Sequence, residues 1–274
     1  MTVAPAAQAP RTATSKADFS GIYTAPDPRP YFMALAPLGY QVPEHAAPLV
    51  RAEIDAPGRD PRAGTVLDLC CSYGINAALL RTSLGLADLT ARYTAPALTD
   101  LSADELAAAD AAYYAAQPTQ PLLRVLGLDA SAPAVRYATR AGLLDEGFAE
   151  DLESADPSPR LARALASVGT VVCTGGVGYI GPATFERLLA HLPPTVRLIV
   201  LVLRVFPYDD IEAVLDAHGL VTRRVPGTVR QRRFTDAAEQ AAAVADVRTR
   251  GLDPTGKEAA GWFHADCFVS RPAR

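Results

Sequence analysis

Two apolar runs of this sequence end in an aspartate that is followed by small residues. The first run, Val66-Leu67-Asp68-Leu69, continues into Cys70-Cys71-Ser72-Tyr73-Gly74, and a helical stretch begins near Asn76. The second run, Leu122 to Leu128, ends in Asp129-Ala130-Ser131. A strand, a turn of small residues and a helix N-terminus together form a general nucleotide-binding arrangement. The spacing therefore predicts a nucleotide-like cofactor at these two strand ends.

The charge of Asp68 indicates which cofactor this is. A dinucleotide site needs glycines that let a pyrophosphate approach the helix, and the Gly-x-Gly-x-x-Gly pattern is absent. A carboxylate at this position would repel a pyrophosphate but attract an ammonium or sulfonium group. S-adenosylmethionine carries both cations and no phosphate, so the residues favour it over a dinucleotide.

Three further segments fit the same cofactor. Asp129 is placed to accept the ribose hydroxyls, although it follows Gly74 by 55 residues instead of the usual distance of about 20. An Ala-rich insertion over 87–118 accounts for the excess length. Glu150-Asp151-Leu152 stands where an adenine amino group needs an acceptor. Cys173 to Tyr179, with Thr174, ends the fourth expected strand beside the transferable group.

Strand-like and helix-like segments alternate after residue 60, which predicts an α/β fold with a mostly parallel sheet covered on both faces. Residues 1–17 are expected to be a disordered tail, 18–60 a lead-in with a short helix near Tyr31 to Leu35, and 61–274 a catalytic domain. The expected strands are 65–69, 122–128, a short one before 148, 168–174, 195–203, 220–225 and 263–270. The expected helices are 76–84, one or two within 87–116, 133–141, 183–191, 209–218 and 236–250.

Over residues 60–270 these anchors resemble the class I S-adenosylmethionine-dependent methyltransferase family. The resemblance implies a doubly wound, Rossmann-like, seven-stranded sheet whose last strand is antiparallel. It also implies that Asp68 and Gly74 contact the methionine part, Asp129 the ribose, and Glu150 or Asp151 the adenine. The full expected set of cofactor contacts is Asp68, Cys70, Ser72, Gly74, Asn76, Asp129, Ala130, Glu150, Asp151, Leu152 and Thr174.

The first loop departs from the family pattern Asp-x-Gly-x-Gly-x-Gly. Cys70 and Ser72 stand where the first two glycines belong, and only Gly74 is kept. A positive φ is costly without glycine. Asn76 could add a contact to the methionine carboxylate. The departure leaves the cofactor assignment in place but opens the question of the reaction.

Aromatic residues of the lead-in suggest a lid over the cofactor. Tyr23, Arg29, Tyr31 and Tyr40 would close over it, or they could simply dock on the sheet. Tyr179 would orient the substrate or face the sulfonium with its ring, or pack on the following helix. Of four histidines, His264 and His45 are candidate general bases, whereas His191 and His218 read as helix-end residues. Tyr179 and His264 are the expected catalytic residues.

Bulk properties exclude several functions. The formal charge is −4, which gives no electrostatic reason to expect nucleic acid. The basic residues between Arg223 and Arg233 are more typical of a solvated face. Adjacent Cys70 and Cys71 favour small core residues over nucleophiles, and the cysteine pattern fits a reducing cytoplasm. No segment predicts a secretion signal or a membrane span. Asp209-Asp210 lacks a third ligand for a metal and fits a helix N-cap.

Three functional hypotheses remain open from the sequence. The first is methyl transfer from S-adenosylmethionine to a small molecule. The second is cyclisation of the cofactor's own methionine chain to azetidine-2-carboxylate, with release of methylthioadenosine. The third is cofactor binding without chemistry, as a sensor or partner subunit. The acceptor molecule and the oligomeric state are not determined by these patterns.

Overall fold

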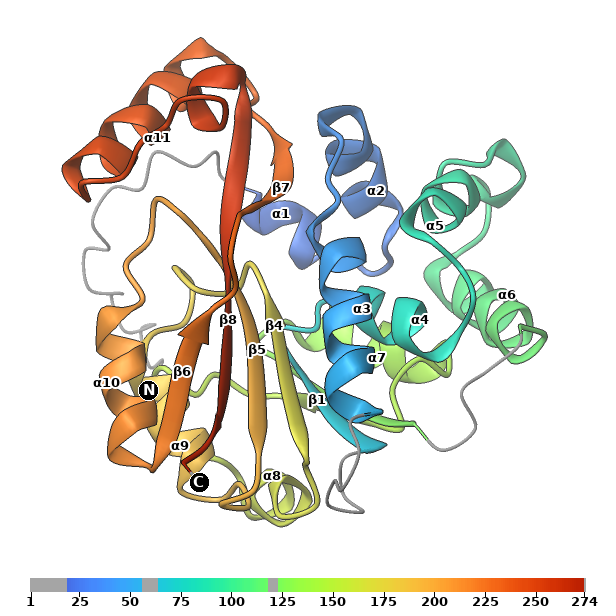
Figure 1. Ribbon diagram of the computed structural model, residues 1–274. Coiled ribbons are helices and arrows are strands. Elements are labelled where there is room, and N and C mark those ends of the chain that lie inside the picture. The colour runs from blue at the N-terminus through green and yellow to red at the C-terminus, as the bar shows by residue number, and fades with distance from the viewer. Residues whose placement is uncertain (1–18, 56–63, 118–122, 274) are drawn as a thin grey trace, which may run out of the picture.

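The computed structural model describes residues 19–55, 64–117 and 123–273 (Figure 1). The expected tail over 1–17 and the first residue of the expected second strand, Leu122, lie outside the described residues. The strands pair in the order β3-β2-β1-β4-β5-β8-β6, and β7 pairs with β8 beside this path. Their bounds are β1 Thr65–Leu69, β2 Arg124–Asp129, β3 Glu146–Ala149, β4 Thr170–Thr174, β5 Arg197–Leu203, β6 Leu220–Arg224, β7 Val229–Arg233 and β8 Trp262–Pro272.

The sheet confirms the expected mostly parallel arrangement with an antiparallel last strand. Strands β1 to β5 run parallel to one another. The last strand, β8, is antiparallel and lies between β5 and β6. Chain order reverses between β1 and β4, and in open α/β sheets this switch point is where ligands bind, outside the carboxyl ends of the strands.

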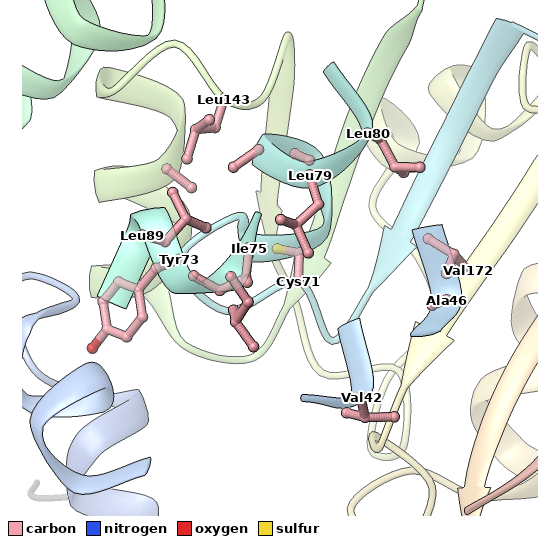
Figure 2. Close-up of a cluster of buried hydrophobic side chains, with 14 of the residues drawn as sticks. Val42, Ala46, Cys71, Tyr73, Ile75, Leu79, Leu80, Leu89, Leu143 and Val172 are labelled. Atoms are coloured by element: carbon pink, nitrogen blue, oxygen red, sulfur yellow. The ribbon is translucent and has the colours of Figure 1, made fainter. Parts of the chain in front are cut away.

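Side chains of successive strand residues enter two separate cores, as the alternation of a strand requires. In β1, Val66 belongs to one core and Leu67 to the other. The first face is covered by α3 (Val42–Ile54), α4 (Ile75–Arg81) and α7 (Ala132–Arg140), and Figure 2 shows the apolar side chains around α4. The second face is covered by α8 (Pro159–Leu165), α9 (Pro182–Leu189) and α10 (Asp209–Ala217). The sheet is therefore doubly wound.

The lead-in contains more helix than the sequence indicated. Helices α1 (Ser20–Tyr23) and α2 (Arg29–Leu35) precede the 3-10 turn η1 (Ala36–Leu38), and α2 matches the expected short helix. Helix α3, which was not expected, packs against α4, β4 and β5. Its residues Val42, Ala46 and Val50 are buried, so this part of the lead-in forms part of the core.

The insertion contains the helices α5 (Leu86–Tyr93) and α6 (Ala103–Ala115), with the 3-10 turn η3 (Pro96–Leu98) between them. The buried carboxylate of Asp110 ties the insertion to α7. It accepts hydrogen bonds from the hydroxyls of Tyr93 and Tyr137, each with an oxygen–oxygen distance of 2.5 Å. Asp104 on the same helix is exposed, whereas Asp110 is completely buried. The Arg92 guanidinium neutralises its charge inside the protein.

Strand β7 adds an eighth strand to the expected seven. The expected solvated basic face is confirmed for Arg223, Arg224, Arg230 and Arg233, which are exposed, but not for Arg232. The sequence of β7, Val-Arg-Gln-Arg-Arg, has too few apolar residues to predict a strand, but Arg232 is only 1% exposed. Its guanidinium pairs with buried Glu239 in α11 (Ala237–Thr249) over 2.6 Å. The chain then passes through the 3-10 turn η4 (Glu258–Ala260) into β8.

The acidic pair Asp209-Asp210 does not provide the expected helix N-cap. Both residues lie in the first turn of α10, and the N-cap is Tyr208. Negative charges in a first turn stabilise a helix through its dipole, without acting as the cap.

Candidate functional site

The loop after β1 takes a left-handed backbone at three alternate residues. The φ angles are 60° at Cys70, 48° at Ser72 and 77° at Gly74. The backbone therefore has the conformation that glycines would allow, although two of the three residues carry side chains. Such residues cost roughly 1–3 kcal/mol each and cluster at functional sites.

Hydrogen bonds from β2 hold this loop in place. The carbonyl of Leu128 accepts from the backbone N–H groups of Cys70 and Cys71, over 2.8 and 3.2 Å. The N–H of Ser72 donates to Asp129 Oδ2 over 2.9 Å. At Gly74, a Cβ would lie 3.1 Å from the Cβ of Leu143, so glycine is required there for space as well as for φ.

Asp68 lies completely buried beneath the loop and has one free oxygen. Its Oδ1 accepts a hydrogen bond from Asn76 Nδ2 over 2.8 Å, and Asn76 also donates to Thr174 Oγ1 over 3.0 Å. Its Oδ2 has no hydrogen-bond partner in the described part of the chain. Burial raises the pKa of Asp68 to about 7; the Asn76 hydrogen bond opposes this rise, and the charge of Asp129 adds to it. Such a carboxylate is suited to a cationic ligand.

Asp129 organises the end of β2. Its two oxygens accept from the N–H groups of Ser72 and Ser131, and burial raises its pKa above the ordinary aspartate value. The hydroxyl of Ser131 donates to the carbonyl of Tyr23 over 2.6 Å, which links this strand end to the lead-in. Ala130 is exposed between the two serine contacts.

The acidic residues after β3 form hydrogen bonds with their own loop and with the N-cap of the next helix. Glu150 accepts from the N–H and the hydroxyl of Ser158, the N-cap of α8. Asp151 accepts from the N–H of Glu153 and the hydroxyl of Ser154. Leu152 is buried in the second core. Both carboxylates therefore stabilise a turn, a use that their position in the sequence did not reveal.

Three lead-in tyrosines converge above Asp68. Tyr31 makes edge contacts with Tyr23 and Tyr40, at ring-centroid distances of 5.8 and 5.9 Å. Burial raises the pKa of Tyr40 to about 12; a hydrogen bond with Tyr31 opposes this rise, and the nearby charge of Asp68 adds to it. Tyr179 is 44% exposed, and its ring lies 6.5 Å from that of Tyr23. The structure thus brings Tyr23, Tyr31, Tyr40 and Tyr179 together.

Arg29 does not join these tyrosines. Its guanidinium pairs with Asp27 and donates to the carbonyls of Leu98 and Thr99, over 2.6 and 2.9 Å. It therefore ties α2 to the insertion.

The hydrogen bonds of the histidines are made with residues other than Asp68. His264 Nδ1 is 2.8 Å from the hydroxyl of Thr228, and burial, with the charges of Arg204, Arg230 and Lys257, lowers its pKa to about 4. His45 hydrogen-bonds Gln41. His191 is exposed just after α9, and His218 pairs with Glu186 at the end of α10.

The adjacent thiols do not have the properties of nucleophiles. A hydrogen bond with Cys173, together with burial, raises the pKa of Cys70, and burial raises that of Cys71. Reactive cysteines need a lowered pKa, because the thiolate is the attacking species.

Sequence reasoning missed Gln231, which lies on β7 and is only 3% exposed. Its side-chain Nε2 lies 3.1 Å from the position that a Cβ on Gly175 would occupy, at the end of β4. The polar pattern of β7 gave no signal for this contact. Its main-chain carbonyl accepts from the N–H of Gln41, next to Tyr40, over 2.8 Å.

The order of the strands and the positions of the acidic residues indicate the same kind of fold. A doubly wound sheet has one antiparallel strand between its fifth and sixth strands, and acidic residues stand at the carboxyl ends of its first two strands. The chain therefore has a doubly wound, Rossmann-like α/β fold. In the residues described, no helix is long and apolar enough to cross a membrane, and no group of three or more His, Cys, Asp or Glu side chains could hold a metal ion.

Several solved structures are similar to this chain at low sequence identity. No family model and no curated protein matches the sequence. The YcgJ protein of Bacillus subtilis is 11% identical, with 84% of this chain and 99% of that chain covered and a TM-score of 0.47. A precorrin-6y C5,15-methyltransferase of Geobacter metallireducens is 9% identical, with coverages of 84% and 88% and a TM-score of 0.43. A magnesium protoporphyrin IX methyltransferase of Synechocystis, solved with bound S-adenosylmethionine, is 14% identical, with coverages of 84% and 77% and a TM-score of 0.41.

Proposed function

We propose that this protein binds S-adenosylmethionine and transfers its methyl group to a small molecule. The observation that carries the proposal is the buried carboxylate of Asp68, whose Oδ2 has no partner among the described residues and whose surroundings include tyrosine rings. A buried unpaired carboxylate is costly, and a cationic ligand would offset this cost. Aromatic ring faces attract the same kind of ligand.

Each part of the cofactor has a counterpart at the strand ends. Asp68 would hold the methionine ammonium, and the left-handed loop through Gly74 would let the backbone approach the methionine part. Asp129 would accept the ribose hydroxyls. Leu152 would contact the adenine from the apolar side, with the turn of Glu150 and Asp151 at its rim. Tyr31 and Tyr40 would face the sulfonium, and Tyr179 would contact the substrate.

The reaction needs little acid–base chemistry from the protein. The sulfonium makes the methyl group electrophilic, and displacement is in line, so orientation and exclusion of water contribute most. With a pKa lowered to about 4, His264 is neutral near pH 7 and a weak base. The acceptor's nucleophile would therefore react without a strong general base.

Calorimetry with S-adenosylmethionine and S-adenosylhomocysteine tests the cofactor. Incubation with a panel of small amines, alcohols and phenols, with detection of S-adenosylhomocysteine by mass spectrometry, tests the transfer. Asp68→Asn should weaken binding of S-adenosylmethionine, whereas Asp216→Asn on the exposed face of α10 should not. Failure of the wild-type protein to bind either ligand would exclude the proposal.

One observation favours a second function at the same site, the cyclisation of the methionine chain. A carboxylate with a pKa of about 7 can take a proton from the cofactor's ammonium group. The freed amine would attack the γ-carbon, and the carbon–sulfur bond would break. The products would be azetidine-2-carboxylate and methylthioadenosine. Incubation with S-adenosylmethionine alone distinguishes the two, because only cyclisation forms methylthioadenosine without an acceptor. Binding without either product would support a protein that only senses the cofactor.

A further inference from the structure

Gln231 reaches the strand ends from a hairpin outside the seven-strand path. Its amide lies against Gly175, which directly follows Thr174. Thr174 accepts from Asn76, and Asn76 donates to Asp68. A hydrogen-bonded set of polar residues thus runs from β1 through α4 to β4, and the side chain of Gln231 lies against the residue that follows it. In Figure 1, β7 lies beside α1 at the end of the sheet where β4 and β5 terminate.

The main chain of Gln231 is held from two sides. Its carbonyl accepts from Gln41, next to Tyr40 of the tyrosine group. The following residue, Arg232, is fixed by the buried ion pair with Glu239 and stacks over Phe19 and Phe263. The side chain is therefore presented on a rigid support, as a ligand contact requires.

The side-chain oxygen of Gln231 is buried and lacks a hydrogen-bond partner within the described ranges. Buried acceptors are nearly always hydrogen-bonded, so an unsatisfied one in a site calls for a ligand. Asp68 Oδ2 is the second such acceptor at the carboxyl ends of β1 and β4. Asp68 would serve the methionine end of the cofactor. Gln231 lies against Gly175, directly after Thr174, at the strand end beside which the transferable group would lie.

We propose that Gln231 Oε1 faces the position of the transferable methyl group and accepts a hydrogen bond from the nucleophile of the acceptor. This inference rests on the proposed function and narrows the substrate to a molecule whose nucleophilic atom carries a hydrogen, an amine or a hydroxyl. An amide that only fills space between β7 and Gly175 would have no effect on ligands at this position.

Sinefungin tests the inference without knowledge of the acceptor, because it carries a protonated amine where the cofactor carries its methyl-bearing sulfonium. S-adenosylhomocysteine has a neutral thioether sulfur there, without a hydrogen-bond donor. The wild-type protein should bind sinefungin more tightly than S-adenosylhomocysteine. Gln231→Met keeps the side-chain length but removes the acceptor, so the preference should fall by about tenfold. Affinity for S-adenosylhomocysteine should change by less than about twofold, since it makes no bond with this oxygen.

Gln240→Met is the matched control, because this glutamine lies on α11 and donates to the carbonyl of Glu258 instead. It should leave both affinities unchanged. An unchanged preference in Gln231→Met, with S-adenosylhomocysteine still bound, overturns the inference while the proposed function stands. Binding of neither ligand by the wild-type protein removes the proposed function itself.

If the Gln231→Met variant binds neither ligand, the Gln231→Glu variant tests the inference instead. It keeps the shape and adds a negative charge, so the preference for sinefungin should increase. A preference that does not increase overturns the inference.

Discussion

Asn76 holds Asp68 through a single hydrogen bond of 2.8 Å, and only one of the two carboxylate oxygens is thereby satisfied. Asn76 gives its other contact to Thr174, so it fixes β1 against β4 at the switch point. The remaining oxygen of Asp68 is buried and unpartnered in the portion of the chain described. The fold therefore keeps a destabilising acceptor at the switch point, where open α/β sheets bind their ligands.

Asp68→Asn should stabilise the free protein at neutral pH. The folded-state pKa of about 7 lies above the ordinary value of 3.8, so the carboxyl contributes stability below pH 3.8 that is lost as the pH rises through 7. The amide has no such loss. The stability of the variant relative to wild type should therefore be about 3 kcal/mol more favourable at pH 8 than at pH 5, as measured by urea unfolding at the two pH values. An equal difference at the two pH values would contradict this, and Asp216→Asn serves as control.

The affinity for S-adenosylmethionine should rise with pH, whereas the contribution of Asp68 to stability falls as the pH rises. A cation is held by the ionised form of Asp68, which becomes the main form only above about pH 7 in the free protein. Between pH 5.5 and pH 7.5 the affinity should rise by about 25-fold. Calorimetry of the wild type and of Asp68→Asn over this range measures it. A pH dependence that persists in the variant would assign the effect to another group.

Ser72→Gly should stabilise the protein. Ser72 has a φ of 48°, and its buried hydroxyl lacks a partner among the described residues. Glycine removes the backbone strain and the unsatisfied oxygen, which together outweigh its greater freedom in the unfolded chain. We expect a gain of about 1 kcal/mol in the free energy of unfolding. The N–H bond to Asp129 is kept, so a loss of stability would show that the hydroxyl has a partner.

Gly74→Ala is the converse change in the same loop. Gly74 has a φ of 77°, and a Cβ would lie 3.1 and 3.2 Å from the Cβ atoms of Leu143 and Ala138. The variant should lose about 2 kcal/mol through strain and crowding. Thermal unfolding measures it, with Gly142→Ala as a control because a Cβ there meets no atom within 4 Å although φ is also positive. Equal losses in the two variants would show that backbone strain alone matters.

Arg232→Met should destabilise the β7 hairpin, because it leaves the buried carboxylate of Glu239 without its partner. Breaking a buried pair from one side costs about 3–5 kcal/mol. The double change Arg232→Met with Glu239→Leu should recover most of this, since both charges are then removed. Chemical unfolding of the two variants measures the difference. A double variant no more stable than the single one would contradict this account.

The strand ends could be predicted from the sequence because their signal is local. An apolar run that stops at an aspartate and small residues predicts Asp68 and Asp129 at one edge of a parallel sheet, and the structure places both there. The left-handed loop could not be predicted in the same way. Cys70 and Ser72 give no sign of a positive φ, which results from the hydrogen bonds that Leu128 and Asp129 accept from the loop.

Tertiary structure alone decided which polar groups remain available. The sequence indicated Glu150 as a ligand contact, but its carboxylate accepts a hydrogen bond from Ser158. Arg29 was expected in the lid, but its guanidinium donates to a carbonyl of the insertion. Gln231 lies in a basic segment that the sequence predicted to be a solvated face, but its side chain is buried against Gly175. Apolar alternation is a property of neighbouring residues along the chain, and so the sequence determined the doubly wound fold. Satisfaction of a polar atom depends on partners far apart in the sequence, and only the packed chain brings them together.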